Sequence, residues 1–171
     1  ALGGGIQNPQ DAAKLINNGA DKVVINSAGY RDLSLVRSIA ETFGNQAVVV
    51  SIDARRDPES DCYHLFSNCG RQREKIDLEE HVISCVEHGA GEIFINSMDL
   101  DGTMQGYDTN LIQRVTECSK VPVISCGGAG TFNHMKEVFL KTETSAVACG
   151  SLFNFGDNNP IRAKAFLSNY D

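Results

Sequence analysis

Two glycine clusters and two serines recur at matched spacing along the chain. Gly3 to Gly5 open one stretch that ends at Ser27, and Gly127 to Gly130 open another that ends at Ser151. The separation from the first glycine to the serine is 24 positions in both stretches. Glycine lets backbone N–H groups approach an anion, and a serine hydroxyl at a neighbouring strand end adds a donor. The repeat therefore predicts two phosphate sites, and a ligand with a phosphate at each end. The alternative is that each cluster only makes a tight turn.

Carboxylates follow two of the apolar runs. Asp53 comes directly after a run of apolar and small residues, where an acid held beside apolar neighbours is a candidate general acid or base. Asp99 and Asp101 follow another such run, and there the alternative is a turn in which Gly102 supplies a positive φ. The Asp-x-Asp pair lacks the other residues of a calcium loop, so we expect no metal site.

Opposite charges begin two of the strand-like runs. With the two-residue period of a strand, Lys22 shares a face with Asn26, and Glu92 shares a face with Asn96. If the two asparagines point into a barrel, Lys22 and Glu92 do so at its other end. We expect these charges to form a structural ion pair or a gate on the barrel axis.

His81, Cys85 and His88 fall at helical spacing, beside an apolar stripe that includes Val82 and Val86. A metal face is one interpretation, but the pattern favours a solvated flank of the helix. The six cysteines are scattered through strand and helix patterns and include no C-x-x-C, so reduced thiols are expected rather than disulfides or structural zinc.

Strand-like runs alternate with amphipathic helix-like stretches throughout the chain. The runs are short, rich in β-branched residues and apolar on both faces, as in parallel sheets covered on both sides; they span residues 22–26, 47–53, 92–96, 121–125 and 145–149. Each helical stretch follows a candidate N-cap, namely Asn8, Asp32, Asp77, Asp108 or Thr131. The pattern predicts an α/β fold of repeated βα units, with a hairpin inserted at about residues 55–75.

The composition is that of an ordinary soluble globular protein. The 171 residues include 15 Lys and Arg against 22 Asp and Glu, a formal net charge of −7, which argues against a nucleic-acid partner. The longest apolar run is far short of the ~20 residues of a membrane span, and the first residues do not resemble a signal peptide. We therefore expect a cytoplasmic protein with no membrane or nucleic-acid partner.

Several of these segments resemble the cyclase subunit of imidazole glycerol phosphate synthase. The resemblance covers nearly the whole chain and rests on specific motifs, among them Leu2 to Ile6, Gly19 to Val23, Val48 to Ala54, Gly89 to Ile93, Asp101 to Thr103 with Gly106 to Asp108, and Ser125 to Gly130. It implies a TIM (β/α)8 barrel, of which residues 1–171 form a single partial domain with roughly strands 3 to 8.

The resemblance also implies an activity and the residues that perform it. The family uses ammonia from a partner glutaminase to convert a phosphoribulosyl-formimino-carboxamide ribotide, which carries two phosphates, into imidazole glycerol phosphate and an aminoimidazole carboxamide ribotide in histidine biosynthesis. It needs no cofactor. By this resemblance Asp53 is one of two catalytic aspartates and Lys22 and Glu92 belong to the ammonia gate. The residues implied at the two phosphate sites are Gly5, Asn26 and Ser27 for one, and Asp101, Gly102, Gly128, Gly150 and Ser151 for the other.

The chain departs from the family pattern in ways that keep other functions open. The family's other catalytic aspartate lies on a first strand that these residues do not include, so we expect a rate lowered ~10²–10⁴-fold or more. Asn96, Cys126 and Asn154 stand where Thr, Ser and His are expected, and residues 155–164 resemble a paralogue that supplies ammonia for amidino-sugar synthesis. The third alternative is a non-catalytic phosphate-binding or partner-binding module. Six βα units leave sheet edges exposed, and these edges predict self-association.

Overall fold

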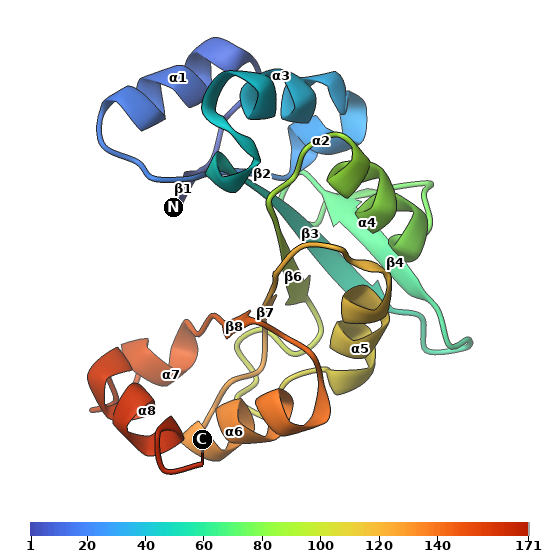
Figure 1. The fold of residues 1–171 in the computed structure, drawn as a ribbon. Helices are drawn as coiled ribbons and strands as arrows, with labels where there is room; N and C mark the ends of the chain where they lie inside the picture. The colour runs from blue at the N-terminus through green and yellow to red at the C-terminus, as the bar shows by residue number, and fades with distance from the viewer. Residues whose placement is uncertain (171) are drawn as a thin grey trace.

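A computed structural model describes residues 1–170 as strands and helices that alternate along the chain (Figure 1). The strands are β1 (Leu2–Gly3), β2 (Val23–Ile25), β3 (Val48–Arg56), β4 (Tyr63–Ser67), β5 (Gln72–Arg73), β6 (Glu92–Ser97), β7 (Val123–Cys126) and β8 (Ala146–Val147). The helices are α1 (Pro9–Asn17), α2 (Ser27–Arg31), α3 (Ser34–Phe43), α4 (Leu78–Glu87), α5 (Thr109–Cys118), α6 (Phe132–Lys141), α7 (Ser151–Asn154) and α8 (Pro160–Leu167), with a 3-10 turn at Asn45–Ala47. The predicted α/β class is confirmed.

Six strands form a parallel sheet in the order β1-β2-β3-β6-β7-β8. Figure 1 shows them as an arc with the helices along its convex side, and with the first and last βα units at opposite ends. Within residues 1–170, β1 pairs only with β2 and β8 pairs only with β7. Because the strands are parallel, their carboxyl ends lie along one edge, where barrels of this class place their active sites.

The alternation along β3 separates a core face from an open face. Val48, Val50 and Ile52 are 0% exposed and pack toward the helices, whereas Ser51 and Asp53 are partly exposed on the other face. Burial of β-branched side chains against helices explains why this run forms a central strand. The same alternation carries Asp53 to the concave side of the arc.

Side-chain caps begin most of the helices as predicted. The side chains of Asn8, Asp77, Asp108 and Thr131 each accept a hydrogen bond from a backbone N–H in the first turn of α1, α4, α5 and α6, respectively. Asp32 differs, because it follows the short helix α2 and its carboxylate accepts from the backbone N–H of Ser34 at 2.8 Å, while the N-cap of α3 is Leu33. Among the described residues, no helix combines the length and the apolar character needed to cross a membrane.

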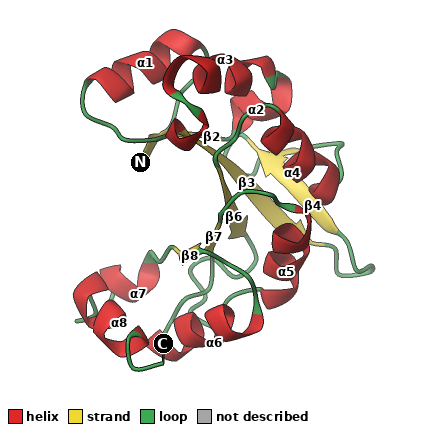
Figure 2. Cartoon of the chain, viewed as in Figure 1, coloured by secondary structure: helices red, strands yellow, loops and turns green. Residues whose placement is uncertain are grey.

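A hairpin extends the sheet beside the second half of β3 (Figure 2). In β4, Phe66 pairs with Asp53 and Tyr63 pairs with Arg56, both antiparallel, and β4 then pairs with β5. The base of the hairpin is fixed to α5, because the Tyr63 hydroxyl donates to the Asp108 carboxylate at 3.0 Å. The turn between β4 and β5 lies at the opposite end of β4.

The prediction of a solvated helix flank was wrong for two of its three residues. His81 is 1% exposed and Cys85 is 0% exposed. The His81 ring stacks on the Tyr30 ring, with centroids 4.2 Å apart and planes at 11°, and burial lowers the pKa of His81 to about 4. Helical spacing alone does not reveal this environment, because Tyr30 reaches the flank from α2, distant in sequence.

Candidate functional site

A cavity of about 520 Å³ lies at the carboxyl ends of β1, β2 and β3. Its lining includes three residues of the first predicted phosphate site, Gly5, Asn26 and Ser27, together with the predicted catalytic residue Asp53. These residues come from three strand ends that the parallel register places side by side. The structure therefore brings together the first glycine cluster and the carboxylate, which are far apart in the sequence.

The first glycine turn presents backbone to open space. Gly4 has a φ of 105° and Gly5 a φ of 70°, and a Cβ built on either residue would meet no other atom within 4 Å. Positive φ favours glycine, and the missing side chains leave backbone N–H groups uncovered. Such a turn suits the approach of an anion to the backbone, and no packing contact explains these two glycines.

Asp53 is held by amides from both flanking strands. The side-chain Nδ2 of Asn26, which directly follows β2, donates to Asp53 Oδ2 at 3.0 Å, and Nδ2 of Asn96, on β6, donates to Asp53 Oδ1 at 3.0 Å. Asp53 and Asn96 are also paired in the β3 to β6 register. The carboxylate is therefore fixed in orientation while it borders the cavity.

The hairpin covers part of the cavity, which the sequence reading missed. The backbone N–H of Asn68 donates to Ser27 Oγ at 2.9 Å, and Asn68 and Cys69 both line the cavity. Both have positive φ, 51° and 58°, at the turn between β4 and β5. The polar and cysteine content of residues 55–75 gave no sign that this turn folds back onto the end of β2.

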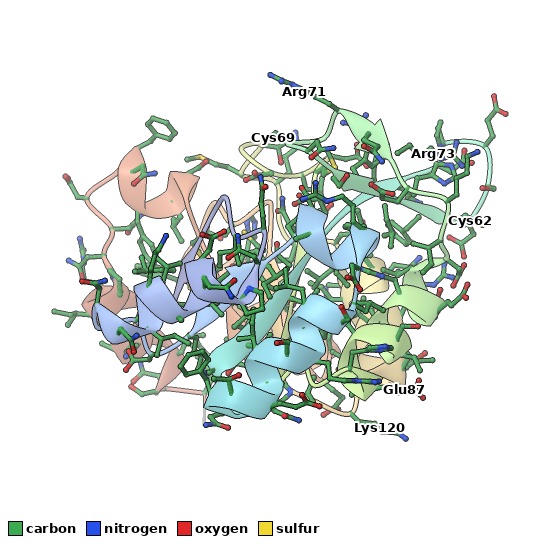
Figure 3. The ribbon with its side chains drawn as sticks, turned by 90° about the horizontal axis from the view of Figure 1, so that it is seen from above. Cys62, Cys69, Arg71, Arg73, Glu87 and Lys120 are labelled. Carbon is green, nitrogen blue, oxygen red and sulfur yellow. The ribbon has the colours of Figure 1, made fainter. Side chains whose placement is uncertain are left out.

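Figure 3 shows the hairpin and the segments that precede two of the strands on opposite sides of the molecule. Cys69 and Arg71 of the hairpin lie on one side of the molecule, and Glu87 and Lys120, which precede strands β6 and β7, lie on the other. Among the residues that line the cavity, Arg31 and Asp53 carry the charge. Arg31, one helical turn after Ser27 on α2, is a further lining residue that the sequence reading did not name.

The second glycine cluster has a different environment. Gly128 has a φ of 100°, and a Cβ on it would lie 1.9 Å from the carbonyl oxygen of Gly106, whose N–H donates to Gly128 O at 2.8 Å. A Cβ on Gly127 would lie 2.5 Å from Ser97 O. Close packing of the loop after β6 explains these glycines, so the alternative of a tight structural turn has direct support here.

The other predicted residues of the second phosphate site lie around this cluster. Asp101 and Gly102 are exposed in the loop after β6, Gly150 precedes α7, and Ser151 is the first residue of α7. Ser27 likewise is the first residue of α2, so the repeat extends to the short helix in each half. None of these four residues, nor Gly128, lines the cavity that contains Asp53.

Lys22 and Glu92 meet at the opposite ends of the strands. Lys22 Nζ donates to Glu92 Oε1, and both side chains are partly buried, 34% and 19% exposed. The ion pair joins the beginnings of β2 and β6 across β3. Direct contact between the two charges matches the expected pairing, and their role as a gate stays a prediction.

Burial affects the thiols of two of the cysteines strongly. All six are free. Burial raises the pKa of Cys126 to about 11 and that of Cys85 to about 12. A thiol with such a pKa is protonated near neutral pH, so these residues are poor nucleophiles. Among residues 1–170, no group of three or more His, Cys, Asp or Glu side chains is arranged to hold a metal ion.

Comparison with known proteins identifies the family. A family model described as "Histidine biosynthesis protein" matches residues 1–159. The chain is 41% identical over 156 residues to imidazole glycerol phosphate synthase subunit HisF of Streptococcus mutans, an alignment that covers 91% of this chain and 62% of the relative. It is 43% identical over 166 residues to the same subunit of Streptomyces griseus, with 97% and 65% covered, and 39% identical to that of Clostridium botulinum, with 97% and 66% covered.

The chain thus spans less than two thirds of the length of these three relatives. The six parallel strands, their helices on one side and the match over residues 1–159 agree with an incomplete (β/α)8 barrel. On this evidence the chain belongs to the histidine biosynthesis protein family and has the TIM barrel fold class that the resemblance predicted.

Proposed function

We propose that the chain forms the phosphate-binding and Asp53-bearing part of a cyclase of the imidazole glycerol phosphate synthase type. One observation carries this proposal: the open glycine turn, Ser27 and Asp53 border one cavity at the carboxyl ends of the strands. The relatives named imidazole glycerol phosphate synthase subunit HisF support it, with identities of 39 to 43%. The substrate is then the bisphosphorylated ribotide, and the nitrogen donor is ammonia.

The cavity offers distinct groups to the two parts of such a substrate. The uncovered backbone of Gly4 and Gly5 binds a phosphate, because N–H groups donate to its oxygens. The Ser27 hydroxyl, which donates to Asn26 Oδ1 at 3.2 Å in the structure, rotates to donate to the phosphate instead. Arg31 is the cation on the same wall. Anchoring the phosphate in this way places the remainder of the ribotide against Asp53, and such positioning lowers the barrier to ring closure.

Asp53 transfers the protons that ring closure with ammonia requires. When ammonia adds to a carbonyl or imine carbon, the new nitrogen carries protons that must leave before the imidazole ring becomes aromatic. A carboxylate within hydrogen-bond reach accepts them as a general base. The amides of Asn26 and Asn96 occupy one acceptor position on each oxygen, which leaves further lone pairs toward the cavity.

The same proposal assigns the remaining predicted residues. Lys22 and Glu92, at the beginnings of the strands, control the passage of ammonia from a glutaminase bound at that end. Asp101, Gly102, Gly128, Gly150 and Ser151 bind the second phosphate. These five residues do not line the cavity around Asp53. The support for this second site is therefore the sequence repeat and the serine that begins both α2 and α7.

Calorimetric titration with the ribotide tests the proposal. Ser27→Asp and Ser151→Asp each place a negative charge against a phosphate and remove a hydroxyl donor, so each weakens binding about 10- to 100-fold, the worth of a hydrogen bond to a charged group. Ser145→Asp, at an exposed residue before β8, makes the same charge change away from both sites and leaves the affinity unchanged. Unaltered binding in both site variants would refute the phosphate assignment.

Turnover of the ribotide with ammonium chloride, with the chain in excess over substrate, tests the reaction itself. We expect slow product formation that requires ammonium and is lost in Asp53→Asn. Ribotide binding without any turnover would instead support the non-catalytic phosphate-binding alternative and refute the cyclase proposal.

A further inference from the structure

Asn26 uses its entire side-chain amide within the protein. Its Nδ2 donates to the backbone oxygen of Ser51 at 3.1 Å and to Asp53 Oδ2 at 3.0 Å, and its Oδ1 accepts from Ser27 Oγ at 3.2 Å. An amide NH2 has two hydrogens, and both are occupied. The side chain therefore has no donor left for a phosphate, and the contacts it makes orient Asp53 instead.

The side chain of Asn96 has one buried polar atom without a hydrogen-bond partner. Its Nδ2 donates to Asp53 Oδ1, but its Oδ1 is buried and has no hydrogen-bond partner. A Cβ on Gly127 would lie 3.1 Å from that oxygen, so the backbone of Gly127 covers it. Leaving a buried carbonyl oxygen unpaired destabilises the fold, and a buried polar group with this cost calls for a compensating role.

The amide orientation follows from the partner. A carboxylate can only accept, so the NH2 group of Asn96 must face Asp53 and the carbonyl oxygen must face Gly127. Threonine, which the family resemblance leads one to expect at this position, is shorter and carries a single donor. The hydrogen bond from Asn96 to Asp53 is thus a property of this chain's own residue.

From these contacts we infer that Asn26 and Asn96 are positioning residues that hold Asp53 as a hydrogen-bond acceptor, one amide on each carboxylate oxygen. This inference deepens the proposed function, since it names the residues that fix the orientation of the carboxylate in that site. One amide N–H faces each carboxylate oxygen, at 3.0 Å in both cases. We call Asn26, Asn96 and the Asp53 carboxylate between them the clamp. It joins the ends of β2, β3 and β6 and depends on the register that pairs Asp53 with Asn96.

Side-chain amide resonances in nitrogen-15 NMR spectra of the whole chain test the clamp without any need for turnover. Asp53→Ala removes the acceptor, so the NH2 resonances of both Asn26 and Asn96 shift and exchange faster with water. Asn96→Asp keeps the side-chain shape but turns an oxygen toward Asp53, and repulsion then alters the Asn26 resonances as well. Unchanged Asn26 resonances in Asn96→Asp would overturn the inference.

Two further variants show whether the Asn26 resonances respond to the Asn96–Asp53 contact or to any added charge. Asn110→Asp makes the same charge change at an exposed residue of α5 and leaves the Asn26 resonances unchanged. Asn96→Leu removes the hydrogen-bond donor without adding charge. It shifts the Asn26 side-chain resonances in the same direction as Asn96→Asp, but by less. Backbone amide spectra that match the unsubstituted chain confirm that each variant folds.

Kinetics then distinguish positioning from a structural role. With ribotide and ammonium chloride, Asn96→Asp lowers the rate constant for bound substrate about 10- to 100-fold, as expected for a displaced reacting group, and leaves the ribotide dissociation constant unchanged. Equal changes in rate and affinity would contradict the assignment. If the unsubstituted chain shows no turnover, the proposed function fails, and the amide resonances alone decide whether the clamp exists.

Discussion

Replacing single glycines by alanine separates a glycine needed for packing from one needed for access to the backbone. Gly5 and Gly128 both have positive φ, 70° and 100°, and both are predicted phosphate-site residues. Around Gly5 a Cβ meets nothing within 4 Å, whereas at Gly128 it would lie 1.9 Å from the carbonyl oxygen of Gly106. The two substitutions therefore add the same methyl group to opposite environments.

The expected losses of stability follow from these contacts. Alanine in the left-handed region costs roughly 1–2 kcal/mol at either position. At Gly128 the methyl group must also displace backbone, and overpacking of this kind adds roughly 1–3 kcal/mol. We expect Gly128→Ala to lower the free energy of unfolding by about 2–5 kcal/mol and Gly5→Ala to lower it by about 1–2 kcal/mol.

Urea denaturation followed by circular dichroism measures both free energies, and titration with inorganic phosphate measures access to the cavity. The Gly5→Ala methyl points into open space beside the cavity, so this variant weakens phosphate binding even though its fold is nearly intact. Equal destabilisation by the two variants, or the larger loss at Gly5, would refute the steric reasoning.

Three other experiments test the core, the ion pair and the sheet edges. Burial lowers the pKa of His81 to about 4 from 6.5. Below pH 6.5 the unfolded chain therefore binds more protons than the folded chain, and the free energy of unfolding falls as the pH drops. The loss between pH 7 and pH 5 is about 2 kcal/mol, and urea denaturation of His81→Phe shows a shallower dependence on pH. A double-mutant cycle with Lys22→Met and Glu92→Gln gives a coupling energy of about 1 kcal/mol, and a value of zero would contradict a stabilising pair. Sedimentation at rising concentration detects association through the free edges of β1 and β8, and Leu2→Lys, in the edge strand β1, reduces it.

The sequence was sufficient to predict the position of Asp53 but not its partners. The apolar run before it predicted a buried strand, and a carboxylate at the carboxyl end of a parallel strand lies at the functional edge of the sheet. The hydrogen bonds from Asn26 and Asn96 depend on which strands are neighbours and in which register. Neither can be read from one strand, because the residues are 27 and 43 positions from Asp53.

Long-range contacts also explain the features that the sequence reading missed. The bond from Asn68 to Ser27 joins residues 41 positions apart, and the stack of His81 on Tyr30 brings α2 against α4. Helix periodicity describes only one element's own surface, so it classified the His81 flank as solvated. In both cases the deciding partner came from another βα unit.

The internal repeat illustrates how equal spacing can conceal unequal chemistry. Both halves place a glycine cluster after a strand and a serine at the first position of a short helix, which is the pattern that the spacing predicted. In the first half Gly4 and Gly5 are open, while in the second Gly127 and Gly128 pack against backbone of the loop after β6. The spacing is preserved because both halves build the same βα unit. The atoms around each glycine then determine whether its missing side chain makes room for a ligand or for the protein's own backbone.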